Sequence, residues 1–161
     1  SISIINQSMM EMNFAPNSFD LIWSEGALYI MGFETGLKKC HELLKDKGYI
    51  AVSELVWLMP DPPAEIKEAH QTAYPPMTSI EENLKTIERC GYKNIGHFTL
   101  PDSSWTNNYY GPMAKKIKQL KKKYVKNDEA MQAIDLAEIE IYLFEKYSAY
   151  FGYEFYIAQK V

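Results

Sequence analysis

Apolar residues form two short continuous runs in the first third of the chain. The first run covers residues 19–23, and the second covers residues 49–58 with Ser53 and Glu54 as its polar members. Continuous apolar runs, unlike alternating ones, indicate strands that are covered on both faces, as in parallel sheets. Residues 33–44, between the runs, carry apolar side chains at helical spacing. The pattern therefore predicts a strand–helix–strand unit with parallel strands.

The rest of the chain continues this alternation. In chain order, the further predicted elements are a short strand at 2–5, a turn at 13–18, a helix from Pro63 to about Tyr74, a helix from Ser79 to Cys90, a strand at 92–100, two long helical segments at 105–124 and 128–150, and a closing strand at 153–161. Ser79 and Glu82 have the spacing of a capping box. Alternating strands and helices place the chain in the α/β class.

Composition limits the possible partners. The chain has 161 residues and a net charge of −4, which suits one soluble domain and gives no field that would attract nucleic acid or a membrane surface. A lysine-rich run at 115–123 is interpreted as the solvated face of a helix rather than as an anion-binding patch. The chain has two isolated cysteines and three histidines without ligand spacing, so we expect a cytoplasmic protein without a metal site.

Polar residues follow the first apolar run and interrupt the second. Ser24, Glu25 and Gly26 come directly after the first run, and Ser53 with Glu54 lies within the second. Open α/β sheets bind ligands at the carboxyl ends of their strands. Glu54 is therefore a candidate for orienting a substrate amine or acting as a general base. A paired or helix-capping glutamate is an equally good interpretation of this residue.

These segments resemble a known family. The sequences Phe-Asp-Leu-Ile-Trp-Ser-Glu-Gly at 19–26 and Leu-Leu-Lys-Asp-Lys-Gly-Tyr at 43–49 are similar to the fourth strand and the turn into the fifth strand of class I (Rossmann-like) S-adenosylmethionine-dependent methyltransferases. The small-molecule branch is the most similar. Residues 8–14 resemble the segment that runs under the adenine ring, although the acidic residue usual there is absent. Further matches in residues 91–110 and 152–157 extend the resemblance over essentially the whole chain.

The resemblance implies S-adenosylmethionine as cofactor and a small-molecule methyl acceptor. The cofactor-binding residues it implies are Ser8, Met9, Trp23, Ser24, Glu25 and Gly26. The substrate-binding residues are Tyr29, Glu54, Trp57, Trp105 and Tyr109, of which the last two would belong to a helical lid at 104–151. The alternatives are a helix cap for Ser24 and Glu25 and ordinary aromatic packing for the tyrosines and tryptophans. No catalytic residue is assigned.

The chain departs from the family in one respect. The family holds its cofactor with a glycine-rich loop after the first strand and an acidic residue at the end of the second, whereas none of the eight glycines here forms a Gly-x-Gly. We therefore expect residues 1–161 to form a partial methyltransferase domain, an incomplete sheet that binds cofactor weakly or not at all by itself.

A further consequence concerns association. The family's first and second strands lie between its third and fourth, so the strand at 19–23 would become an exposed edge that favours a homodimer. The alternatives to an enzyme are a truncated, non-catalytic module that dimerises through this edge, and a different α/β protein that binds a nucleotide.

Overall fold

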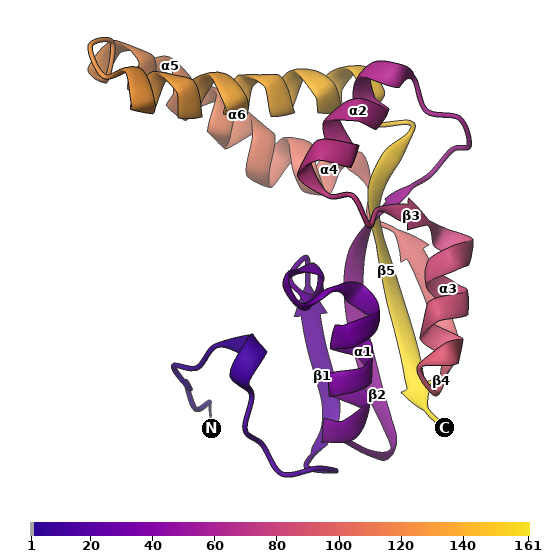
Figure 1. Cartoon of the computed structure of the whole chain (residues 1–161). Coiled ribbons are helices and arrows are strands. Elements are labelled where there is room, and N and C mark those ends of the chain that lie inside the picture. The colour runs from indigo at the N-terminus through magenta and orange to yellow at the C-terminus, as the bar shows by residue number, and fades with distance from the viewer. Residues whose placement is uncertain (1) are drawn as a thin grey trace. The chain divides into compact units, whose positions relative to one another are not determined.

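The computed structural model describes residues 2–161, which divide into two compact units (Figure 1). Unit 1 comprises the chain up to Val56 together with Pro76–Thr99 and Tyr153–Val161, and unit 2 comprises Trp57–Pro75 and Leu100–Gly152. The lid predicted over residues 104–151 falls within unit 2. The single-domain organisation stays a prediction.

Unit 1 is built on an open sheet. Its strands are β1 (Phe19–Glu25), β2 (Leu44–Trp57), β3 (Thr78–Ser79), β4 (Tyr92–Thr99) and β5 (Phe151–Lys160). The strand order is β1-β2-β5-β4, with β3 paired to β2 outside this path. Strands β1 and β2 are parallel, whereas β4 and β5 are antiparallel. The mixed α/β sheet with an antiparallel final strand confirms the predicted fold class.

One face of this sheet carries the hydrophobic core. Helices α1 (Phe33–Leu43) and α3 (Ile80–Arg89) supply buried side chains that pack against strand residues. The core cluster consists of Leu28, Phe33, Leu37, Cys40, Leu44, Ile50, Val52, Ile87, Cys90, Tyr92, Tyr156 and Ala158. Because side chains alternate along a strand, Phe155 points to the opposite face from Tyr156. That opposite face carries exposed aromatic residues, since Trp23 and Phe98 both contact Phe155 and are half exposed or more.

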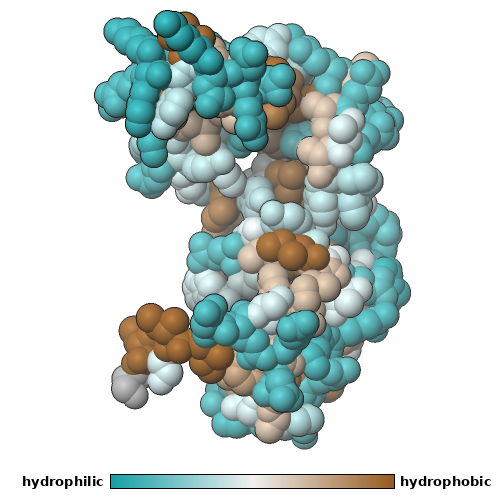
Figure 2. Space-filling view, turned by 60° about the vertical axis from the view of Figure 1, so that its left-hand side comes forward, coloured by the Kyte–Doolittle hydropathy of each residue, from teal (hydrophilic) through white to brown (hydrophobic). Residues whose placement is uncertain are grey.

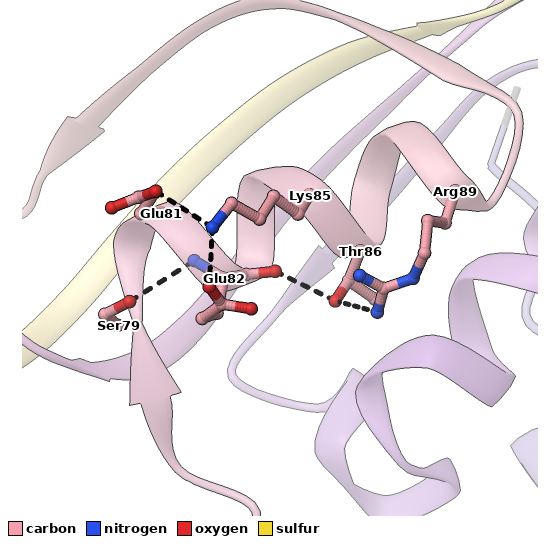
Figure 3. Close-up of polar contacts among 6 residues, drawn as sticks. All are labelled: Ser79, Glu81, Glu82, Lys85, Thr86 and Arg89. Atoms are coloured by element: carbon pink, nitrogen blue, oxygen red, sulfur yellow. Dashed lines mark hydrogen bonds and ion pairs between the residues drawn. The ribbon is translucent and has the colours of Figure 1, made fainter.

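Helix α3 shows how local sequence fixes an element. The Ser79 hydroxyl accepts a hydrogen bond from the Glu82 backbone N–H at 3.2 Å (Figure 3), as the capping-box spacing predicts. Lys85 forms ion pairs with both Glu81 and Glu82 on the exposed side of the helix. The helix ends at Arg89, and Gly91 follows with a φ of 84°, a left-handed conformation that glycine adopts easily.

Unit 2 is helical. Its elements are α2 (Ala64–Ala73), α4 (Asp102–Trp105), the π-helical turn η3 (Thr106–Tyr110), α5 (Gly111–Lys123) and α6 (Asp128–Tyr147). Asn127 caps α6 by accepting a hydrogen bond from the Ala130 N–H at 3.0 Å. In the lysine-rich run, Ile117 is buried while Lys115 and Lys116 are exposed, as expected for a solvated helix face. Lys146 links α6 to α2 through an ion pair with Glu65.

Two predicted boundaries were wrong. The apolar residues Ile2, Ile4 and Ile5 form no strand and are 60–96% exposed, because no strand among the described residues pairs with them. Figure 2 shows the apolar surface (brown) that gathers at this N-terminal arm. Strand β2 begins at Leu44 instead of residue 49. The residues predicted as a turn, which include Lys47 at a φ of 64°, form an irregular start of this strand.

None of the helices in residues 2–161 has the length and apolar character that a membrane-spanning segment requires.

Replacing Ser79 with alanine should destabilise unit 1, because the Glu82 N–H loses the side-chain oxygen that accepts its hydrogen bond at the start of α3. We expect a loss of about 1 kcal/mol in the free energy of unfolding, measured by urea denaturation. Ser3→Ala, in the exposed N-terminal arm, is the matched control and should leave the midpoint unchanged. Equal midpoints for the two variants would contradict the capping role.

Candidate functional site

The carboxyl ends of β1 and β2 meet at one edge of the sheet. The register pairs Glu25 with Ser53, so the residues that follow β1 lie beside the polar residues of β2. The Gly26 N–H donates a hydrogen bond to the Ser53 hydroxyl at 2.9 Å. In Figure 1, the arrowhead of β4 points the same way as that of β1, whereas β5 runs in the opposite direction. This edge is where open α/β sheets bind ligands.

Gly26 lies in a turn that excludes a side chain. Its φ is 52°, and a Cβ added there would lie 3.3 Å from Cε1 of Tyr153. The Tyr153 ring on one side and the Ser53 hydroxyl on the other therefore hold the turn after β1. The turn is therefore fixed at the carboxyl edge of the sheet, with the space beside Gly26 filled by the Tyr153 ring.

The other predicted cofactor-binding residues are more exposed. Trp23 is 60% exposed, packs against Phe155 at 5.4 Å between ring centroids, and donates its indole N–H to the Glu25 carboxylate. Ser24 is partly buried. Ser8 caps a 3₁₀ turn, η1 (Met9–Glu11), by accepting a hydrogen bond from the Met10 N–H. Their roles toward a cofactor remain predictions.

The predicted substrate-binding residues fall into both units. In unit 1, Tyr29 lies in the 3₁₀ turn η2 (Leu28–Met31) and is about half exposed, whereas Glu54 is buried on β2. Trp57, Trp105 and Tyr109 belong to unit 2. The structure thus groups these last three within one unit.

A chain of aromatic contacts links the three residues of unit 2. Trp57 contacts His70 edge-on, and His70 contacts Phe151 at 4.6 Å. From Phe151 the contacts continue through Phe144 and Tyr110 to Trp105 and Tyr109. Trp105 directly precedes the π-helical turn and Tyr109 lies within it, and such turns are uncommon elements found frequently at functional sites. These residues therefore show the aromatic packing that was the alternative to substrate binding. Tyr109 is nevertheless partly exposed.

Burial perturbs titratable groups in this aromatic chain. Burial lowers the pKa of His70, so its imidazole is held in the neutral form. Burial also raises the pKa of Tyr109, with a further contribution from the Glu140 carboxylate. The same carboxylate accepts a hydrogen bond from Tyr110 at 3.2 Å. Glu140 was not among the residues predicted from sequence.

The sequence analysis also missed Ser53 and Tyr153 as determinants of the turn at Gly26. Ser53 was recognised only as a polar interruption of an apolar run. Tyr153 is more than 120 residues away from Gly26 along the chain, and no local pattern connects the two.

A model of a methyltransferase domain matches residues 1–52, the segment that contains β1, α1 and the first part of β2. No curated protein matches the chain in sequence.

Several solved structures resemble the chain. A candidate sarcosine dimethylglycine methyltransferase from Galdieria sulphuraria is 16% identical, with a TM-score of 0.72, and the alignment covers 96% of this chain and 57% of that chain. An S-adenosylmethionine-dependent methyltransferase from Geobacter sulfurreducens, solved with S-adenosylhomocysteine, is 14% identical, with a TM-score of 0.73 and coverages of 90% and 59%. The [4+2]-cyclase SpnF is 19% identical, with a TM-score of 0.67 and coverages of 96% and 54%.

The chain has the fold of the class I S-adenosylmethionine-dependent methyltransferases. It spans a little more than half the length of these three solved structures. The cofactor that the methyltransferase resemblance implies is S-adenosylmethionine. The turn at Gly26 lies at the carboxyl edge of β1 and β2, which is where open α/β sheets bind ligands. A Gly-x-Gly loop is not present within residues 1–161.

In this methyltransferase fold, replacing Gly26 with alanine should destabilise the turn after β1. The left-handed φ and the Tyr153 ring both oppose a Cβ, so we expect a loss of about 1–2 kcal/mol in the free energy of unfolding. The measurement is urea denaturation followed by tryptophan fluorescence. Gly96→Ala is the matched control, because a Cβ there meets no atom within 4 Å. The same loss in both variants would show that the turn has no special requirement.

Proposed function

We propose that residues 1–161 are part of an enzyme that transfers the methyl group of S-adenosylmethionine to a small molecule. The observation that carries this proposal is the turn at Gly26, fixed by Ser53 and Tyr153 at the carboxyl edge of a sheet with the methyltransferase fold. The family-model match over residues 1–52 supports it independently. The name of the Galdieria protein, which refers to small amines, agrees with a small acceptor.

The bound cofactor would supply an activated methyl group, so the protein needs mainly to position the acceptor. Ser24, Glu25 and Gly26 would flank the methionine part of the cofactor. Glu54, Tyr29 and the aromatic residues Trp57, Trp105 and Tyr109 would contact the acceptor. Ser8 and Met9 would lie near the adenine.

Residues 1–161 alone should bind S-adenosylhomocysteine weakly or not at all. The physical reason is that a Gly-x-Gly loop provides the backbone N–H groups that hold this ligand, and the sequence contains none. Isothermal titration calorimetry measures the affinity, with the Geobacter sulfurreducens methyltransferase as positive control. Micromolar binding by residues 1–161 would contradict the expectation. If the natural reading frame upstream of Ser1 encodes such a loop, the longer protein should bind in the micromolar range.

A second candidate function is a non-catalytic module that dimerises, and the position of β1 favours it. Strand β1 is an edge of the sheet among the described residues, and Leu21 and Trp23 on it are at least half exposed. An exposed apolar edge strand is a template for pairing with another chain.

Light scattering coupled to gel filtration tests this candidate. The chain should elute as a dimer, and Leu21→Lys should shift it to a monomer because a charge on an edge strand opposes pairing. Ile95→Lys is the matched control, since Ile95 is equally exposed on β4 at the other edge. A wild-type monomer would exclude dimerisation through β1.

A further inference from the structure

A buried carboxylate lies on β5, outside the residues that the sequence pointed to. Glu154 is 1% exposed, and both of its oxygens are engaged by residues of β4. His97 Nδ1 lies 2.5 Å from Oε1, and the Thr99 hydroxyl donates to Oε2 at 2.6 Å. His97 is about one-third exposed, so the Glu154–His97 pair contacts solvent through the imidazole ring.

Tyr156 connects this carboxylate to a second one. It is two residues further along β5 and therefore on the same face of the sheet, where it is fully buried. Burial raises the pKa of Tyr156, and the negative charges of Glu154 and then Glu54 raise it further. Glu54 is 3% exposed on β2, the strand beside β5. It lies two residues after Val52, which shares the core cluster with Tyr156, so Glu54 is on the same face of the sheet.

Unpartnered polar atoms point to a ligand in this cluster. The Asn83 amide nitrogen and the Tyr156 hydroxyl are buried, and neither has a hydrogen-bond partner among the described residues. Asn83 is a buried residue of α3, the helix whose Ile87 shares the core cluster with Tyr156. Unpaired buried polar groups are costly, so native structures seldom retain them without a function.

The chemistry of the cluster selects a cation. Two carboxylates taken out of water attract positive charge strongly, because the surrounding dielectric is low. An ammonium group offers N–H donors to carboxylate and hydroxyl oxygens and carries the charge that the cluster favours.

We propose that Glu54, Asn83, Glu154 and Tyr156, the acidic cluster, bind the cationic nitrogen of the methyl acceptor, which makes the acceptor an aliphatic amine. The identification of the bound amine as the methyl acceptor rests on the proposed function, whereas the binding of an amine to these residues does not depend on it. The acidic cluster is a recognition site, and we assign it no proton transfer. All four residues belong to unit 1.

A pair of isosteric probes tests this assignment on the wild-type chain. N,N-Dimethylethanolamine is a cation at neutral pH, and 3-methylbutan-1-ol has the same shape without the charge. Titrations followed by NMR chemical shifts should show binding of the amine about tenfold or more tighter than that of the alcohol. Equal affinities, or no binding of the amine, would overturn the proposal.

Variants locate the binding. Glu154→Gln and Glu54→Gln should each weaken amine binding about tenfold or more and leave alcohol binding unchanged. Glu88→Gln, an exposed glutamate on α3, is the matched control and should have no effect. Circular dichroism checks that each variant folds. Amine affinities equal to wild type in both cluster variants would refute the site, even if the amine binds elsewhere.

Failure of the methyltransferase proposal gives a different result. Amine binding that depends on Glu154, together with no methyl transfer from S-adenosylmethionine by any longer form of the protein, would leave the acidic cluster standing. Methyl transfer to non-amine acceptors, together with no preference for the cationic probe, would refute amine binding by the acidic cluster and leave the methyltransferase proposal standing.

Discussion

Because β1 and β2 run parallel, the polar residues that end their apolar runs must meet at one edge of the sheet. This pairing brings Gly26 to Ser53 and makes the turn after β1 a part of the site. The antiparallel insertion of β5 beside β2 then places Tyr153 against the same turn. The candidate site thus depends on backbone pairing first and on side-chain chemistry second.

The sequence predicted the elements whose signals are local. The capping residues Ser79 and Asn127 begin the helices that follow them, and both accept the expected hydrogen bonds. The apolar run at 19–23 forms β1, which pairs with β2. Its Phe19 and Ile22 pack against the core, whereas Leu21 and Trp23 stay exposed, so the run is not covered on both faces as its continuous apolar pattern predicted. Residues 2–5 have the same β propensity but remained unpaired, because a strand needs a neighbour to satisfy its backbone.

The non-local part of the site could not be read from the sequence. In the closing strand, Glu154 and Tyr156 alternate with Tyr153 and Phe155, and a polar residue in such a pattern normally faces solvent. The structure buries Glu154 and Tyr156 instead, because α1 and α3 cover that face and β4 supplies the partners of Glu154. Such an arrangement depends on which strand becomes the neighbour of β5, which no local pattern specifies.

Fold alone does not decide the reaction, because a [4+2]-cyclase shares this architecture with the methyltransferases. What can distinguish this chain is the charge that its sheet buries. A glutamate that is 1% exposed would normally be replaced by an apolar residue if it served packing alone, because burying an ionised carboxylate opposes folding. Glu154 instead retains two polar partners on β4 and lies beside an unsatisfied tyrosine hydroxyl. The stability lost by burying this carboxylate is easiest to understand if it is regained when a cation binds.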